Sequence, residues 1–183
     1  LFMHSEKVVD YQIYYRFFSM GSTIFTLALT PIWSIVTKAI NEKKGTWVRS
    51  LYHKILVLAM IASIFEFLIA LFFQMIVNIF YGDAAIVVNK WYSVSFALFG
   101  TLLIFNAAFS SITNGLSKLK GQLFAFSIGA IIKIPLTYFL ITVFESWIGA
   151  VLSTSIALLI YCIIEPIYIR ICFNFSKAES PVR

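Results

Sequence analysis

Long apolar runs separated by short polar segments dominate the chain. They cover roughly residues 11–40, 55–80, 91–116, 121–143 and 147–172. A helix needs about 20 apolar residues to cross a bilayer, and every run meets that length. No run alternates strictly between polar and apolar residues, as a strand of an outer-membrane barrel would. The pattern predicts an all-α fold, a polytopic bundle of about five transmembrane helices that forms one domain over residues 1–183.

Composition supports the same class of protein. Of the 183 residues, 61% are hydrophobic and 12% are charged, which is about half the charged fraction of soluble domains. Mean hydropathy is +0.92. A soluble domain of this size could not cover so much apolar surface, and so apolar a chain does not stay disordered. Cys162 and Cys172 lie in one apolar run and indicate neither a disulfide framework nor a metal site.

The basic residues gather on alternate sides of the predicted spans. Most of the 14 Lys and Arg residues lie in segments 38–54, 117–121 and 170–183, whereas segments 1–10, 81–90 and 144–146 contribute only Lys7 and Lys90. Because cytoplasmic loops carry the excess of positive charge, the N-terminal end is predicted outside and the C-terminus in the cytoplasm. This topology accounts for the net charge of +6, and the scattered basic residues predict no nucleic-acid partner.

The segment between the first two runs has a pattern of its own. Gly45 interrupts the chain, and Thr46 is a residue type that could cap a helix. Apolar residues then occupy one face and polar residues the other: Trp47, Val48, Leu51 and Tyr52 against Arg49, Ser50, His53 and Lys54. The pattern predicts a short amphipathic helix over 46–54 that lies in the cytoplasmic interface. A plain basic loop is the alternative.

The first span carries a polar residue at every third or fourth position, here called the polar stripe. Its members are Gln12, Arg16, Ser19, Thr23, Thr26, Thr30, Ser34, Thr37 and Asn41. At about 100° per residue they fall within an arc of about 80°, so one side of the predicted helix is polar along its length. Facing lipid would be costly, which places the stripe against protein or water.

Two interpretations of the polar stripe follow. Small hydroxyls can bond across an interface and hold helices together. Alternatively, the stripe is the wall of a hydrated cavity, which its length and the presence of Arg16 favour. On this interpretation the predicted substrate-binding residues of the first span are Gln12, Arg16, Ser19, Thr23, Thr26 and Thr30. Pro31 is expected to kink the same helix or to act as a hinge.

Charged side chains inside spans mark pathways by default. Glu66 and Lys133 lie near the middle of the second and fourth spans, and Glu165 lies towards the inner end of the fifth. Glu66 and Lys133 either form an ion pair, or Lys133 attracts an anionic substrate while Glu66 handles a coupling cation. Glu165 is a further candidate for the coupling ion or an ion pair.

Other polar residues could complete the same lumen. Asn106 shares one face of the third span with Ser110, and we assign Asn106 to the substrate-binding set. Pro135 and Pro166 are predicted to act as further hinges, because proline frees a carbonyl one turn earlier. The sequence shows no nucleophile–base pair, no Gly-rich phosphate loop and no spaced acidic cluster, which favours a transporter over an enzyme and predicts no metal or cofactor.

The chain resembles a known family of transporters. The resemblance lies in VVDYQIYYRFFSMGSTIFTLALTPIWSIVTKAI, the basic KKGTWVRSLYHK, the span ending IVNIFYG, and KIPLTYFLITVFESWIGAVLSTSIALLIY. These stretches are similar to the polysaccharide flippases, which export O-antigen and capsule units and belong to the multidrug/oligosaccharidyl-lipid/polysaccharide superfamily. The chain would match most of their C-terminal lobe and begins at Leu1, so we expect an N-terminal lobe to be missing.

The resemblance implies a fold, a substrate and partners. Its members have two pseudo-symmetric lobes around a cavity that opens alternately to either side. They move an oligosaccharide on undecaprenyl diphosphate across the bacterial cytoplasmic membrane, with the lipid bilayer, the missing lobe and a polysaccharide polymerase as partners. Cationic cavity residues matter in such flippases, and Arg16 and Lys133 could fill that role here.

Two alternatives stay open. The chain could belong to a cation-coupled small-molecule or drug antiporter of the same superfamily, in which acidic cavity residues are essential and Lys133 is dispensable. It could instead be a non-transporting membrane scaffold or a truncated remnant, in which the polar stripe only holds helices together.

Overall fold

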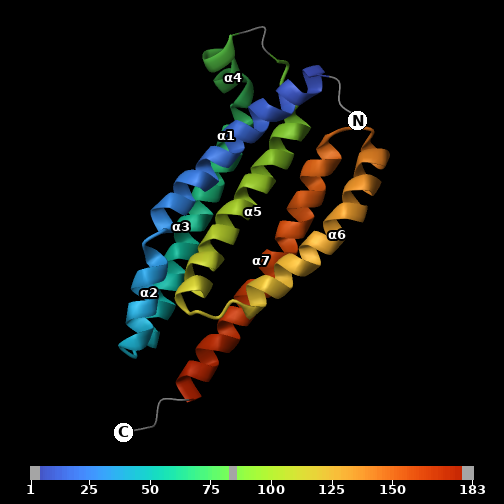
Figure 1. Cartoon of the computed structure of the whole chain (residues 1–183). Helices are drawn as coiled ribbons and strands as arrows, with labels where there is room; N and C mark the ends of the chain where they lie inside the picture. The colour runs from blue at the N-terminus through green and yellow to red at the C-terminus, as the bar shows by residue number, and fades with distance from the viewer. Residues whose placement is uncertain (1–4, 83–85, 179–183) are drawn as a thin grey trace.

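The computed structural model is a bundle of long helices that run up and down side by side (Figure 1). It describes residues 5–82 and 86–178, with side chains for 7–82 and 86–172, and contains no strand in these ranges. The helices are α1 (Ser5–Leu29), α2 (Ile32–Asn41), α3 (Gly45–Leu71), α4 (Phe73–Tyr81), α5 (Lys90–Gly115), α6 (Lys120–Phe144) and α7 (Ile148–Ala178).

The predicted all-α membrane bundle is confirmed. In the described residues, 5 helical stretches are long and apolar enough to cross a membrane: Lys7–Asn41, Gly45–Leu71, Lys90–Gly115, Lys120–Phe144 and Ile148–Cys172. Successive spans run in opposite directions, so the two ends of the chain lie at opposite ends of the bundle (Figure 1). The basic turn after α2 and the basic turn between α5 and α6 lie at the same end, as the charge pattern requires.

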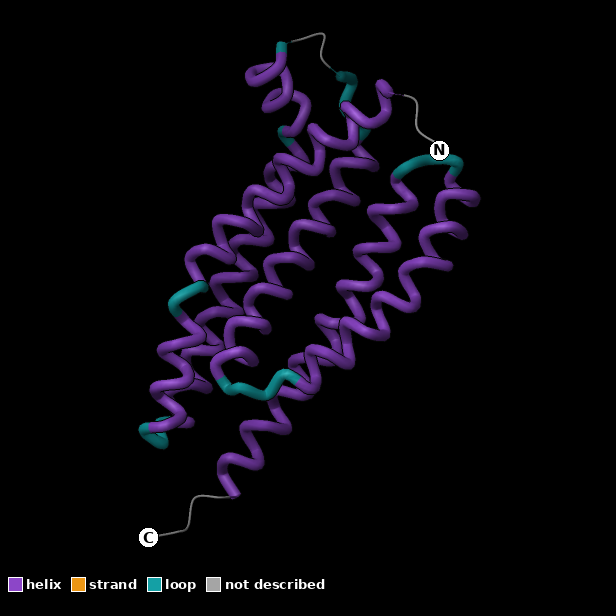
Figure 2. The backbone as a smooth tube through the Cα atoms, viewed as in Figure 1, coloured by secondary structure: helices purple, strands orange, loops and turns teal. Residues whose placement is uncertain are grey.

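The first span is broken where the sequence places Pro31. Helix α1 ends at Leu29 and α2 begins at Ile32, with a short turn between them (Figure 2). Pro31 occupies the position before the first residue of α2, with φ −71° and ψ −16°. A proline fits there because the first N–H groups of a helix have no intrahelical partner. The hinge predicted at Pro31 therefore coincides with a break in the helix.

Residues 46–54 differ from their prediction. They are helical, but they form the first turns of α3 and continue without interruption into the second span. No glycine or proline follows Gly45 before α3 ends at Leu71, so nothing in the sequence stops the helix. Val48 and Tyr52 share a buried face with Ile55 and Ala59, which docks this segment on the bundle rather than in a separate interfacial layer.

The second span also has a break, at Phe72, which separates α3 from the short helix α4. The amide of Gln74 on α4 holds the loop that leads to α5. Its Oε1 accepts from Val88 N at 2.8 Å, and its Nε2 donates to Ile86 O at 3.2 Å. Asn89 then caps α5, because its side chain accepts from Trp91 N at 2.9 Å.

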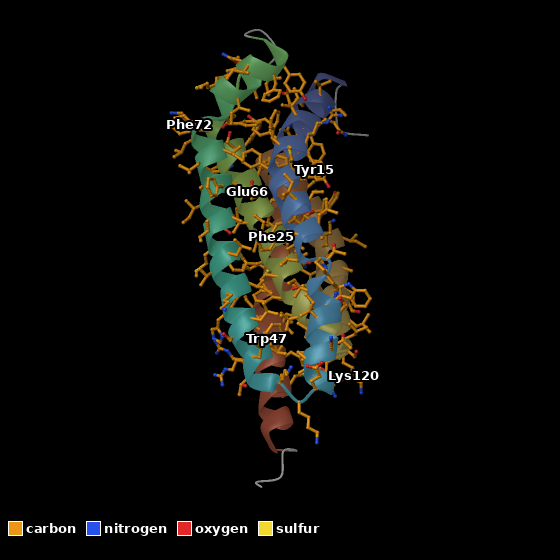
Figure 3. All side chains as sticks on the ribbon, turned by 90° about the vertical axis from the view of Figure 1, so that its left-hand side faces the viewer. Tyr15, Phe25, Trp47, Glu66, Phe72 and Lys120 are labelled. Carbon is orange, nitrogen blue, oxygen red and sulfur yellow. The ribbon has the colours of Figure 1, made fainter. Side chains whose placement is uncertain are left out.

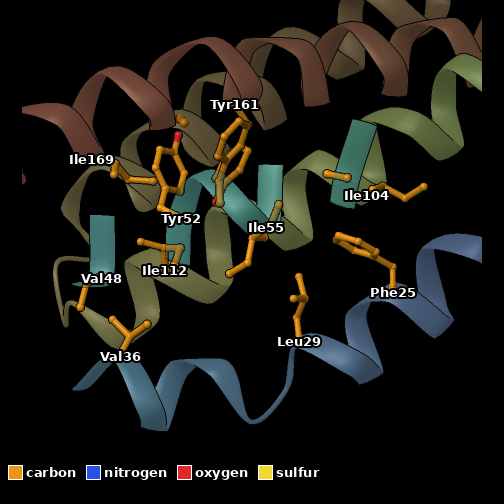
Figure 4. Packing of buried hydrophobic residues seen from close by; sticks show 14 of the residues in the cluster. Phe25, Leu29, Val36, Val48, Tyr52, Ile55, Ile104, Ile112, Tyr161 and Ile169 are labelled. Atoms are coloured by element: carbon orange, nitrogen blue, oxygen red, sulfur yellow. The ribbon is translucent and has the colours of Figure 1, made fainter. Parts of the chain in front are cut away.

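Helix α5 is the centre of the bundle. It packs against α1, α2, α3 and α7, and buried residues occur along its whole length. One core cluster joins it to Phe25, Val36, Tyr52 and Tyr161 from four neighbouring helices (Figure 4). Helix α6 packs mainly against α7. The close approach of α6 and α7 depends on small residues, since a methyl group on Gly129 would lie 3.2 Å from Ala157 O.

Apolar residues cover the outer surfaces of α3 and α6. Ile64 and Phe65 of α3, and Ile131 and Ile134 of α6, are among the most exposed side chains. In water such surfaces would be a liability, but in a bilayer they face hydrocarbon. The outward polar residues of α1 and α2 interrupt this apolar exterior, as does the exposed Lys133 of α6.

Candidate functional site

The middle part of the polar stripe lines a groove between α1, α2 and α5. The groove has a volume of about 870 Å³. The side of α1 and α2 supplies Ser22, Thr23, Thr26, Leu27, Leu29, Thr30 and Trp33, and the opposite side supplies Leu103, Asn106, Ala107, Ser110, Ser111, Asn114, Ser117 and Leu119. Three predicted stripe residues and the predicted Asn106 thus line one site.

The threonines of α1 and of the turn that follows it share one hydrogen-bonding arrangement. Thr23 Oγ1 donates to Ser19 O at 2.8 Å, and Thr26 Oγ1 donates to Ser22 O at 2.8 Å. Thr30 Oγ1 repeats the bond to the carbonyl of Thr26 at 3.1 Å. Each hydroxyl proton is therefore engaged within the helix, and the oxygen keeps its remaining lone-pair capacity for a partner outside it.

The α5 side of the groove carries amides and further hydroxyls. Asn106, Ser110 and Asn114 recur every four residues and so lie on one face of the helix. The Nδ2 group of Asn106 is buried and has no hydrogen-bond partner among the described residues. Ser110 Oγ lies 2.9 Å from the Tyr161 hydroxyl of α7, which ties the groove wall to the interior of the bundle.

The rest of the polar stripe lies outside the groove. Gln12, Arg16, Ser34 and Asn41 are exposed, and none of them lines the groove. Ser19 is half-buried and bonds back to Arg16 O at 3.5 Å. The predicted substrate-binding residues nearest the N-terminal end of α1 are therefore not part of the groove. Arg16 has no ion pair in the described part of the chain.

Thr37 is the exception among the stripe hydroxyls. Within the described residues, Thr37 is the only member of the polar stripe with a hydrogen bond to another helix. Its Oγ1 donates to Gly115 O of α5 at 2.9 Å. The other stripe hydroxyls that donate bond to carbonyls of their own segment. The stripe as a whole does not hold helices together, which favours the cavity-wall interpretation over packing.

Glu66 is buried in the interface between α1, α3 and α5 (Figure 3). Its carboxyl group occupies the space beside Gly21 of α1 and Gly100 of α5. The Oε2 atom has no hydrogen-bond partner in the described residues. A buried carboxyl oxygen without a partner is costly, which makes Glu66 a candidate for a specific role in packing or ion handling.

The ion pair considered for Glu66 and Lys133 does not form. Within the described residues the one ion pair joins Lys44 and Glu42 at 2.6 Å. The reason is that Lys133 belongs to α6, which packs mainly on α7, and its side chain is exposed rather than turned into the α1–α3–α5 interface that holds Glu66. Lys133 does not line the groove either.

Glu165 belongs to a second buried polar group behind the groove. Thr113 Oγ1 donates to Glu165 Oε1 at 2.5 Å, while Oε2 has no hydrogen-bond partner in the described part of the chain.

Helices α6 and α7 run unbroken through Pro135 and Pro166, so these two predicted hinges are not breaks in the structure. The neighbouring turns of the packed α6–α7 pair hold the helices together despite the lost hydrogen bonds.

Several lining residues were not predicted from the sequence. Ser22 lies beside the polar stripe, and Trp33 lies on α2 across the break. Asn114 continues the four-residue spacing of Asn106 and Ser110, a signal that could have identified it. No such periodic signal marks Trp33, since the break at Pro31 changes the direction in which α2 presents its side chains.

Comparison with known proteins does not assign this site. No family model matches the chain, no curated protein matches it, and no solved structure matches it.

Proposed function

We propose that the chain is part of a transporter that moves a lipid-linked oligosaccharide, the repeat unit on undecaprenyl diphosphate, across the bacterial cytoplasmic membrane. The observation that carries this proposal is the groove of about 870 Å³, which presents hydroxyl and amide groups within a helix bundle whose exterior is apolar. A polar head group cannot cross hydrocarbon without such a substitute for water. The sequence resemblance to the polysaccharide flippases supports the same substrate.

The arrangement of the helices supports alternating access. The groove lies between α1–α2 and α5, and the break at Pro31 falls within its length. Transporters rock one helical unit against another around a binding site near the middle of the membrane. In this proposal a second lobe covers the polar stripe from the outside, and the polyprenyl tail stays in lipid while the head group moves.

The proposed orientation follows from charge. The basic turns of the α2 and α5 ends and the C-terminal end of α7 face the cytoplasm, and the loop between α4 and α5 faces outward. A polysaccharide polymerase on the outer side is the partner that would receive the translocated unit. The reaction involves no bond chemistry, so the proposal requires no catalytic residue.

A triple substitution in the groove tests the proposal. In cells whose surface polysaccharide depends on the full-length protein, Thr23→Val, Thr26→Val and Thr30→Val together should abolish surface polysaccharide, with the lipid-linked precursor accumulating inside. Thr142→Val is the matched control, because Thr142 makes the same bond to the carbonyl four residues earlier, at 2.8 Å, but lies on α6 outside the groove. Normal polysaccharide in the triple variant at unchanged protein level would contradict the proposal.

One observation favours a second candidate, the cation-coupled antiporter. Glu66 and Glu165 are both buried, and each has one carboxyl oxygen without a hydrogen-bond partner in the described residues. Such carboxyls can take a proton or a cation. An antiporter would lose drug efflux on Glu66→Gln and keep it on Lys133→Ala, measured as accumulation of a fluorescent cation in cells.

A further inference from the structure

We infer that the groove between α1, α2 and α5 binds the uncharged sugar rings of the substrate, with Trp33 as the stacking surface, and that the diphosphate is held elsewhere. This inference rests on the proposed function and assigns one part of the substrate to one set of residues. It follows from the charge of the lining, the direction of its hydrogen bonds and the position of its indole ring.

The groove has no group that would neutralise a diphosphate. Its lining consists of Ser, Thr, Asn, Ala, Leu and Trp residues, and no charged residue lines it in the described part of the chain. Proteins bind phosphate groups with Arg, Lys or clustered backbone N–H groups. Arg16 and Lys133 both lie outside the lining, so the anionic part of the substrate has its candidate partners at a distance from the groove.

The hydrogen-bonding capacity of the α1 wall also disfavours phosphate. On the wall formed by α1 and the turn after it, Thr23, Thr26 and Thr30 donate their protons to carbonyls of their own segment and therefore offer acceptors to the groove. A phosphate oxygen is itself an acceptor and gains nothing from such a wall. A sugar hydroxyl both donates and accepts hydrogen bonds. It can therefore donate to the α1 wall and accept from the exposed amide of Asn114 on the α5 wall.

Trp33 provides the apolar surface that a pyranose ring needs. It lines the groove beside Thr30, and 52% of its surface is exposed. An exposed indole offers a large flat apolar face with little conformational freedom, which suits the C–H face of a sugar ring. A groove of about 870 Å³ lies within the range of about 300–1,000 Å³ for ligand sites.

Photo-crosslinking in cells tests the inference directly. The full-length protein carries benzoylphenylalanine in place of Leu27, an apolar lining residue that is 68% exposed. The matched control carries it in place of Ile64, which is 60% exposed on the outer surface of α3. After irradiation the purified protein is stained for carbohydrate before and after mild acid, which cleaves the bond between sugar and diphosphate.

The expected result is carbohydrate attached at position 27, resistant to acid, and none at position 64. Trp33→Leu in the same protein should lower the yield about tenfold, whereas Trp33→Phe should retain most of it because a phenyl ring still stacks. Trp91→Leu is the control for loss of an indole, since Trp91 is 55% exposed outside the groove.

Two results would overturn the inference and leave the proposed function intact. Carbohydrate at position 27 that mild acid removes would place the diphosphate or lipid in the groove. Absence of carbohydrate at position 27, in cells that still make surface polysaccharide, would place the sugars elsewhere. If the Leu27 variant blocks polysaccharide, the probe at Leu119, another exposed lining residue, replaces it. Failure of the proposed function itself is read separately, from the triple threonine variant.

Discussion

The Oε1 atom of Glu66 occupies the space that a side chain on Gly21 would fill. On its other side, a methyl group on Gly100 would lie 2.9 Å from Glu66 Oε2. The carboxyl group is therefore held between α1 and α5, and two glycines make room for it. The position of Glu66 is set by packing as much as by polarity, which gives the first prediction.

Gly21→Ala should destabilise the bundle by about 1–3 kcal/mol, the usual cost of overpacking. The added methyl group would meet only the Glu66 carboxyl group within 4 Å, so Glu66→Ala should remove most of that cost. Denaturant unfolding of the purified protein, followed by tryptophan fluorescence, would measure the four free energies of this double-mutant cycle.

Gly100→Ala is the control for the cycle. A methyl group there also lies 2.8 Å from Phe18 O, a backbone atom that cannot move aside. Glu66→Ala should therefore rescue Gly100→Ala much less than it rescues Gly21→Ala. Equal rescue of both variants, or none for Gly21→Ala, would contradict the proposed placement of the carboxyl group.

Thr37 and Thr23 should separate stability from transport. Thr37 Oγ1 satisfies the carbonyl of Gly115 at the end of α5, where helix carbonyls lack intrahelical partners. Thr37→Val should lower the free energy of unfolding by about 1 kcal/mol. Thr23→Val removes an exposed hydroxyl of the groove and should leave unfolding unchanged while lowering surface polysaccharide. The opposite pattern would make the stripe a packing device.

Cysteine labelling should show whether the groove is wet. In a background with Cys162→Ala and Cys172→Ala, a membrane-impermeant thiol reagent should label Thr23→Cys, Thr26→Cys and Thr30→Cys. Ile64→Cys should resist labelling, because the charged reagent does not enter hydrocarbon. Ser155→Cys should also resist it, since that position is 3% exposed within the bundle. Protection of all three threonine positions from either side of the membrane would support the scaffold alternative.

Arg16 and Lys133 should be needed for the substrate's charge and not for the fold. Both side chains are exposed and lack an ion pair in the described residues, so Arg16→Ala and Lys133→Ala should leave the protein level unchanged and abolish surface polysaccharide. Lys54→Ala is a control for loss of charge, because Lys54 is an exposed cation in the N-terminal part of α3. Normal polymer in both the Arg16 and the Lys133 variants would remove these residues from the proposed substrate site.

The sequence identifies the spans because hydrophobic length is a local property. The five runs, the alternation of basic ends and the interruption at Pro31 can all be seen without the structure. The prediction of a separate helix over 46–54 is wrong, because an amphipathic pattern of two turns fits an interfacial helix and a helix docked on a bundle equally well. Only the burial of Val48 and Tyr52 distinguishes the two.

The site can be predicted only in part. Periodicity brings Thr23, Thr26 and Thr30 to one face of a helix, and Asn106 is recognisable as a polar residue within a span. Which helices meet is a tertiary property, and it separates Lys133 on α6 from Glu66 on α3 although both lie at mid-span. Depth along a helix can be read from a sequence, but the direction around the bundle cannot.

The break at Pro31 divides one wall of the groove into two parts that can change their relative orientation. Thr26 lies on α1 and Trp33 on α2, so the two ends of one wall belong to separate helices. Rotation of α2 about the intervening residues would change the width of the groove without unwinding either helix. Under the proposed function, a wall built from two helices would accommodate repeat units of different length, whereas an unbroken helix would present a wall of one fixed length.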